Sequence, residues 1–137
     1  MTSTFSRGTA LVLALVALGC SGGGDNNDNN PAGPVAGPLR VVLTSPNTDD
    51  GAVMFQVTGA VDSVVVPAGL TLYQSVPGSN VIRAIVTGDL ASGDNLLTLY
   101  VADVGLASGY STQVLQVAAQ GTYAQRPTGA YSLTVQK

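Results

Sequence analysis

The chain has 137 residues and a formal net charge of −3, with 9% charged residues, no His, no Trp and a single Cys. Five cationic residues argue against a nucleic-acid-binding surface, and one Cys excludes an internal disulfide. The absence of His removes the commonest general base and transition-metal ligand. The length accommodates one ordinary domain together with a targeting segment.

Residues 1–19 are predicted to be an export signal. Arg7 is the first charged residue, and an apolar run of Ala, Leu and Val follows it at 10–18. As a helix this run is roughly 14 Å long, about half of the hydrocarbon core of a membrane, so it is too short to span. A cationic start, a short apolar stretch and small residues after it are typical of a removable signal peptide.

The end of this run, Ala17-Leu18-Gly19-Cys20, resembles the lipobox of bacterial lipoproteins. In that family the Cys thiol receives diacylglycerol, the signal is cut before the Cys, and the new amino terminus is acylated. The resemblance implies that Cys20 is the first mature residue and the lipidation site, although Ala17 stands where the family usually has Leu. Two or three acyl chains, such as palmitate, give a lasting membrane anchor.

Residues 20–38 are predicted to be the lipidated Cys and a flexible tether. The segment 21–38 reads SGGGDNNDNNPAGPVAGP, which contains one Val and no aromatic residue. It cannot bury enough surface to offset the entropy of ordering, so we expect a linker with a reach of roughly 24 Å. Ser21 follows the Cys where lipoproteins kept in the inner membrane often have Asp. The resemblance therefore implies the outer membrane or the cell surface.

Residues 39–137 are predicted to form an all-β domain. Short runs of Val, Leu, Ile, Thr and Tyr are broken about every eight to twelve residues by Gly, Pro, Asn, Asp or Ser. This texture is typical of an antiparallel sandwich or barrel, and we expect a β-sandwich of jelly-roll or Ig-like type with about seven to nine strands. We expect strands near 39–44, 52–58, 62–66, 69–74, 80–87, 95–101, 111–118 and 130–136.

Three of these strands alternate apolar and polar side chains, which predicts one buried and one solvated face. The segment 112–120 fits a helix as well as a strand, and its neighbours favour the strand. The segment 88–95 is rich in turn residues between two strong strands, which predicts a hairpin. The residues expected to face the core are Val53, Phe55 and Val57, then Leu97, Leu99 and Val101, and finally Tyr131, Leu133 and Val135.

Two parts of the domain resemble cohesin-like sandwiches. One is the strand-turn-strand unit 44–59, which ends in Gly, and the other is 85–104, where Gly-Asp-Leu-Ala-Ser-Gly-Asp precedes an alternating strand. Cohesins are jelly-roll modules that bind partner domains through a sheet face. The resemblance implies a sandwich fold and a protein-binding role.

The Asp residues are candidates for metal binding or catalysis. Asp49 and Asp50 precede a Gly, and their oxygens suit a hard cation such as Ca²⁺. The same residues are typical of a loop between strands, which is the simpler interpretation. Asp89, Asp94 and Asp103 are expected to be solvated loop charges. An Asp pair could also serve a glycosidase, although nothing in the sequence places a carboxyl group in an apolar pocket.

The tyrosines are the best candidates for ligand contact. Tyr73, Tyr100 and Tyr110 form the candidate ligand face, because exposed rings on a sheet stack against sugars or contact partner chains. Tyr100 alternates with buried positions, so it is expected on an outer face. The alternative is that the tyrosines line the edge of the core.

The anchor, the tether and the missing catalytic residue types predict a lipid-anchored cell-envelope protein with a non-catalytic binding or structural module. We expect no enzyme and no cofactor, because without His no Ser is activated by the usual base. The expected partners are the membrane, through Cys20, and a protein or polysaccharide, but not nucleic acid. Two alternatives remain: a small Asp-dependent envelope hydrolase and a purely structural envelope lipoprotein.

Overall fold

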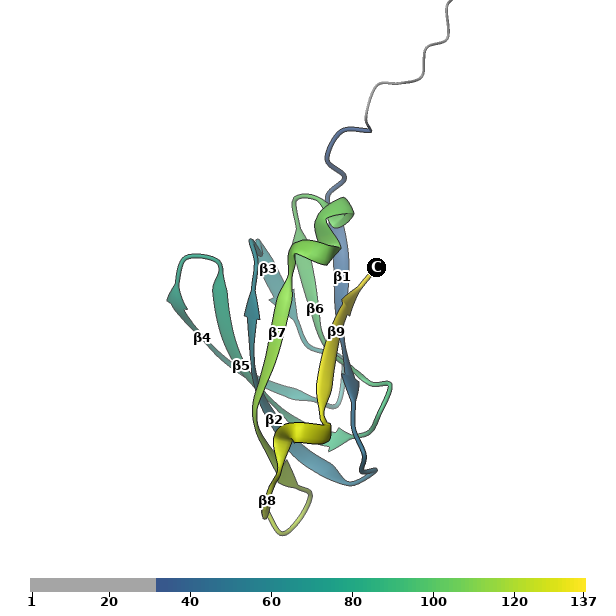
Figure 1. Cartoon of the computed structure of the whole chain (residues 1–137), viewed down its shortest axis with the longest axis vertical. Coiled ribbons are helices and arrows are strands. Elements are labelled where there is room, and N and C mark those ends of the chain that lie inside the picture. Colours follow the sequence, from purple (N-terminus) through teal and green to yellow (C-terminus); the bar gives the residue numbers. More distant parts are fainter. Residues whose placement is uncertain (1–31) are drawn as a thin grey trace, which may run out of the picture. The chain divides into compact units, whose positions relative to one another are not determined.

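The computed structural model describes residues 32–137, so the predicted signal peptide, Cys20 and most of the predicted tether lie outside the described residues. Within this range the chain forms nine strands in two antiparallel sheets, joined by short loops and two short 3-10 helices (Figure 1). The predicted all-β sandwich is confirmed. In residues 32–137 no helix is long and apolar enough to cross a membrane.

Each of the eight predicted strands has a counterpart, and the segment 112–120 belongs to a strand rather than a helix. A two-residue strand and the two 3-10 helices were not predicted. The elements are β1 (Gly37–Thr44), β2 (Asp50–Thr58), β3 (Ser63–Val65), β4 (Thr71–Gly78), β5 (Val81–Leu90), β6 (Asn95–Val101), η1 (Val104–Gly109), β7 (Ser111–Ala119), β8 (Gln125–Arg126), η2 (Thr128–Ala130) and β9 (Ser132–Gln136).

The four-stranded sheet has the order β3-β6-β1-β9, and the five-stranded sheet has the order β4-β5-β2-β7-β8. The hairpin predicted over 88–95 is therefore wrong, because β5 and β6 lie in different sheets. Both edges of β5 are occupied by β2 and β4, and both edges of β6 by β1 and β3. The segment is a crossover, and hydrogen bonds from Gly93 N–H to Leu43 and from Leu43 N–H to Asp94 hold it against β1.

The core lies between the inward faces of the two sheets and is mainly aliphatic. The predicted inward sets of 52–58 and 95–101 are confirmed, since all six side chains are buried. In β9 and just before it, Tyr131 and Leu133 are buried and Val135 is half-buried. Burying each Leu or Phe side chain contributes about 2 kcal/mol, so this cluster is the main source of stability.

The predicted boundary at residue 39 is too late. β1 begins at Gly37, and Val35 is already attached to the domain. The Val35 N–H donates to the carboxylate of Asp103 at 3.2 Å, and its carbonyl accepts from Val104 at 2.8 Å. Composition alone placed these residues in the tether, because their partners lie almost seventy positions away along the chain.

Candidate functional site

The three tyrosines of the predicted ligand face do not share one surface. Tyr73 lies on β4 in the five-stranded sheet and is 60% exposed, whereas Tyr100 lies on β6 in the four-stranded sheet and is 43% exposed. Tyr100 is on an outer face, as expected. Tyr110 precedes β7 and is half-buried against the core, which is the alternative that the sequence left open.

Tyr110, just before β7, contacts the residues that follow β2. Its hydroxyl donates to the carbonyl of Ala60, and its ring packs over Gly59, where an added Cβ would lie 2.3 Å from the ring. Gly59 also has a φ of +151°, which side chains rarely adopt. Desolvation raises the pKa of Tyr110, and the nearby Asp62 and Asp103 raise it further. The phenol therefore remains a donor at neutral pH, and its role here is structural.

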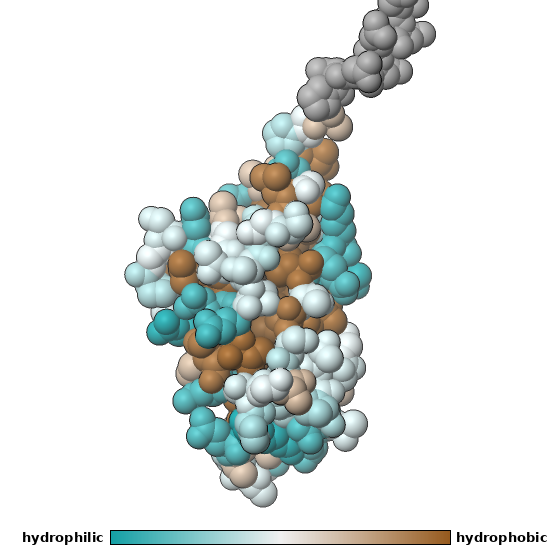
Figure 2. Space-filling view, viewed as in Figure 1, coloured by the Kyte–Doolittle hydropathy of each residue, from teal (hydrophilic) through white to brown (hydrophobic). Residues whose placement is uncertain are grey.

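The outer face of the five-stranded sheet carries a row of apolar side chains. Tyr73 on β4 is paired with Ile85 on β5, which is paired with Met54 on β2. We call these three residues the apolar row. Figure 2 shows hydrophobic residues exposed between polar ones on the face of the domain that it draws. Because neighbours in register lie about 5 Å apart, the three side chains form one continuous strip.

Two shallow depressions meet along this strip. One, of about 230 Å³, is lined by all three residues of the apolar row, and the other, of about 340 Å³, by Met54, Ile85 and Tyr123. The other side chains that line the two depressions are uncharged Gln, Ser, Ala and Val, apart from Arg83, whose guanidinium donates to Gln56 at 3.3 Å. The face therefore has an apolar centre, hydrogen-bonding groups around it and little charge.

Tyr123 stands at the far end of this face with a strained backbone. It lies in the loop between β7 and β8, is 76% exposed and has a φ of +55°. A left-handed conformation costs a bulky residue about 1 kcal/mol, and such strain concentrates at functional sites. Tyr123 is one of the tyrosines that the sequence offered as ligand candidates, but it was not placed on the predicted ligand face, because its position depends on how the β7–β8 loop closes.

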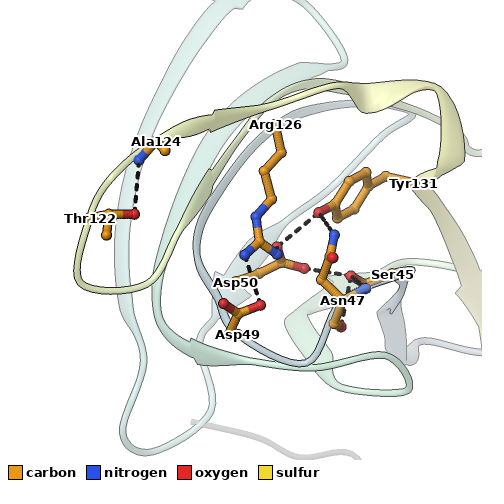
Figure 3. A network of polar contacts seen from close by, with 8 residues as sticks. All are labelled: Ser45, Asn47, Asp49, Asp50, Thr122, Ala124, Arg126 and Tyr131. Carbon is orange, nitrogen blue, oxygen red and sulfur yellow. Dashed lines mark hydrogen bonds and ion pairs between the residues drawn. The ribbon is translucent and has the colours of Figure 1, made fainter.

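Asp50 is the fully buried polar residue of the domain and lies at the centre of a polar network (Figure 3). Arg126 from β8 donates to Asp50 at 2.8 Å and to Asp49 at 2.7 Å. The hydroxyl of Tyr131 donates to Asp50 at 2.9 Å, and that of Ser45 donates at 2.5 Å. We call the following residues the Asp50 network: Ser45, Asn47, Asp49, Asp50, Arg126 and Tyr131.

These contacts explain why a carboxylate is tolerated in the core. Both oxygens of Asp50 accept hydrogen bonds, and the guanidinium neutralises the charge. Hydrogen bonding to Asp49, followed by contact with Tyr131 and by the charges of both carboxylates, raises the pKa of Arg126. The prediction that Asp49 and Asp50 both lie in a loop is partly wrong, because Asp50 is the first residue of β2 and is buried.

The candidate Asp residues lie at separate places in the described part of the domain, apart from the neighbours Asp49 and Asp50. Asp49 and Asp50 both face Arg126, and within residues 32–137 no three Asp, Glu, His or Cys side chains form a group able to hold a metal ion. Asp94 accepts from the Ala91 N–H at 2.7 Å, and Asp103 accepts from the Gly105 N–H at 2.8 Å. These two carboxylates order loops. The prediction that Asp89 lies in a loop is wrong, because it is an exposed residue of β5.

Comparisons with protein-family models, with curated proteins and with solved structures find no match to this chain. Cys20 lies outside the described residues, and its lipidation stays a prediction from the sequence.

Proposed function

We propose that the protein is a lipid-anchored component of the bacterial cell envelope whose β-sandwich is a non-catalytic module that binds another protein. The observation that carries the binding role is the apolar row of Tyr73, Ile85 and Met54 on the outer face of the five-stranded sheet. A sheet face in contact with water alone usually carries polar side chains at these positions.

The composition of this face favours a protein as the partner. The centres of protein interfaces are enriched in Tyr, Phe, Trp, Met and Arg and depleted in Lys, Glu and Asp. The face carries Tyr73, Met54 and Arg83 at one side and Tyr123 at the other, with Gln side chains between them. Tyr is a frequent energetic centre of such interfaces, because its ring is large and loses little conformational entropy.

The envelope location is supported by the N-terminal sequence. The apolar run at 10–18 is too short to span a membrane, and it ends at the lipobox-like Cys20. The Gly- and Asn-rich residues that follow suit a tether that holds a domain away from lipid headgroups. A binding module needs such a spacer to reach partners in the envelope.

The non-catalytic assignment is supported by the state of the carboxylates. Asp50 is enclosed by three polar partners, and Asp94 and Asp103 are bound to loop amides. A general acid or base must reach the proton of a substrate, and these groups are already committed to the fold. Hydrolytic turnover that disappears in a single Asp→Asn variant would contradict this assignment.

Photo-cross-linking in the native membrane tests the binding role. A benzoyl-phenylalanine in place of Tyr73 is expected to capture a polypeptide, because it stands on the proposed face. The same residue in place of Tyr100 is the matched control, since that tyrosine is exposed on the opposite sheet. Equal capture at both positions, or capture of polysaccharide, would contradict the proposed partner and surface.

Mass spectrometry of the purified native protein tests the anchor separately. The expected product begins at Cys20 and carries a diacylglycerol thioether together with an acylated amino group. A protein that retains Met1, or whose Cys20 sulfur is unmodified, would contradict lipid anchoring without bearing on the sheet face.

A further inference from the structure

The strands at the edges of the two sheets differ in how well their free backbone groups are protected from pairing with another chain. β3 and β8 contain only three and two residues, and β9 receives a hydrogen bond at the Leu133 carbonyl from Thr112 of β7. β4, by contrast, has eight residues and its outer edge is unpaired. Its sequence TLYQSVPG carries no charge, and Pro77 lies near its end. Long, uncharged edge strands are usually covered, because their free N–H and C=O groups pair with other strands.

The inward side of β4 is also uncovered. Leu72 packs against the core, but Gln74 and Val76, farther along the same strand, are exposed, and Val76 is 67% accessible. β3 in the opposite sheet ends at Val65 and is too short to cover them. In Figure 1 the hairpin of β4 and β5 turns away from β3.

The resulting groove is lined by apolar side chains, by uncharged polar ones and by one negative charge. It encloses about 180 Å³, and its walls include Val64 from β3 and Val76 and Ile82 from the hairpin. Asp62 stands at its rim, exposed to solvent, and no Lys or Arg within residues 32–137 pairs with it. We call this cavity the β3–β4 groove.

We propose that the edge of β4 and the β3–β4 groove bind an extended segment of another polypeptide. That segment has apolar residues at alternate positions and a Lys or Arg that pairs with Asp62. Its backbone adds a sixth strand to the five-stranded sheet beside Thr71–Val76, and an inward-facing apolar side chain covers Val76. Strand addition of this kind obtains affinity from backbone hydrogen bonds and specificity from side-chain pockets.

The negative rim is the reason for choosing a different polypeptide over a second copy of this chain. In a symmetric dimer the added strand would be another β4, which has no cation to offer Asp62. The apolar residues of the groove and the Asp62 carboxylate together fit a strand that combines Val-like residues with one basic residue. The inference rests on the proposed binding role and shares β4, which carries Tyr73, with the apolar row. The groove residues Val76 and Asp62 do not belong to the apolar row, so variants at these two positions test the inference separately from the proposed function.

Selection from a phage library of random linear peptides tests this inference with the full chain in detergent. We expect enriched peptides to alternate apolar and polar residues and to contain Lys or Arg. Hydrogen exchange of the β4 amides at 71–76 is expected to slow about tenfold when a synthetic copy of the selected peptide binds. Failure to enrich this pattern, or protection only at other strands, would overturn the inference.

Two matched pairs of variants locate the peptide. Val76→Lys is expected to weaken binding about tenfold, whereas Val65→Lys, also on an exposed valine but outside the groove, leaves it unchanged. Asp62→Asn is expected to weaken binding about fivefold, with Asp89→Asn as the equivalent charge change elsewhere. All four positions are exposed, so the variants are expected to unfold at the temperature of the parent chain.

The remaining outcomes are also decisive. Binding that survives Val76→Lys but is lost in Tyr123→Ser would place the peptide on the outer face; this would support the proposed function and overturn the groove. Self-association of the chain that Val76→Lys abolishes would show that a second copy occupies β4 and would overturn the choice of partner. Retention of the cross-link at position 73 without any groove-binding peptide would overturn this inference alone.

Discussion

The sandwich has two sides at which the edge strands of its two sheets come together, and these two sides are built in opposite ways. On one side β7, β8 and β9 meet, and the Asp50 network and the bond from Thr112 to Leu133 join them. On the other side β3 and β4 end their sheets, and the β3–β4 groove lies open between them. Polar contacts buried in the interior close the first side, whereas the second leaves Val76 and Gln74 accessible.

This difference separates stability from binding. A closed side contributes to the free energy of unfolding, because each of its polar groups becomes unsatisfied if a partner is removed. An open side contributes little, so substitutions there are tolerated and its surface remains free for a partner. Changes on the closed side are therefore expected to alter stability, and changes on the open side to alter affinity.

The largest effect is expected at the centre of the closed side. Asp50→Ala removes a buried carboxylate that accepts hydrogen bonds from Arg126, Tyr131 and Ser45, so the free energy of unfolding is expected to fall by roughly 3 kcal/mol. Asp49→Ala is the control, because Asp49 pairs with the same guanidinium but is 63% exposed at its side chain. It is expected to cost at most about 1 kcal/mol.

Urea unfolding of both variants measures this contrast. Similar losses of stability in the two variants would show that burial of Asp50 is not what matters. Asp50→Asn adds a further distinction, since it keeps the shape of the side chain but removes the charge that Arg126 neutralises. It is expected to lie between the parent and Asp50→Ala.

The sequence was sufficient for those parts of the fold that depend on local patterns. Alternation along 52–58 and 95–101 predicts which side chains are buried, because a strand places every second residue on the same side. The predicted hairpin at 88–95 was wrong because Gly and Asp turn a chain equally well within a sheet and between sheets. What decides between these arrangements is that β5 already has two neighbours, which no local pattern reveals.

The candidate sites depend even more on distant contacts. Asp50 and Arg126 are 76 positions apart, and Arg126 lies on a two-residue strand without a recognisable pattern. The predicted ligand face included Tyr73, which belongs to the apolar row, but also Tyr100 and Tyr110, which lie elsewhere. The sequence could not separate them, because the surface on which an aromatic ring lies depends on the order of the strands in the sheets. The groove could not be predicted, because it exists only where β3 is shorter than β4.

A smaller effect is expected at Tyr110, which packs over Gly59 at one end of the groove. Tyr110→Phe removes the hydrogen bond to Ala60 and is expected to cost about 1 kcal/mol at neutral pH. The raised pKa of Tyr110 in the folded chain also gives a pH dependence. The unfolded phenol loses its proton first, near pH 10, so this stabilisation is present below that pH and is lost as the pH rises through the folded-state value.

Thermal unfolding between pH 5 and 11 checks this expectation. With no His in the chain, the midpoint temperature is expected to be constant from about pH 5 to 8 and to fall above pH 10. The fall is expected to be shallower in Tyr110→Phe. An identical alkaline profile in the variant would show that another group is responsible.

The smallest effect on stability is expected at Tyr123, and it has the opposite sign. Tyr123→Gly relieves the left-handed backbone, which is expected to offset the greater entropy of a glycine in the unfolded chain and to leave a gain of at most about 1 kcal/mol. Asn80, with a φ of 60°, is the control: Asn tolerates this conformation, so Asn80→Gly is expected to give no gain. If Tyr123→Gly is more stable but loses the cross-link formed at position 73, then the strain is retained for binding. If it is more stable and the cross-link is unchanged, Tyr123 has no part in the proposed face, which would then be confined to the apolar row.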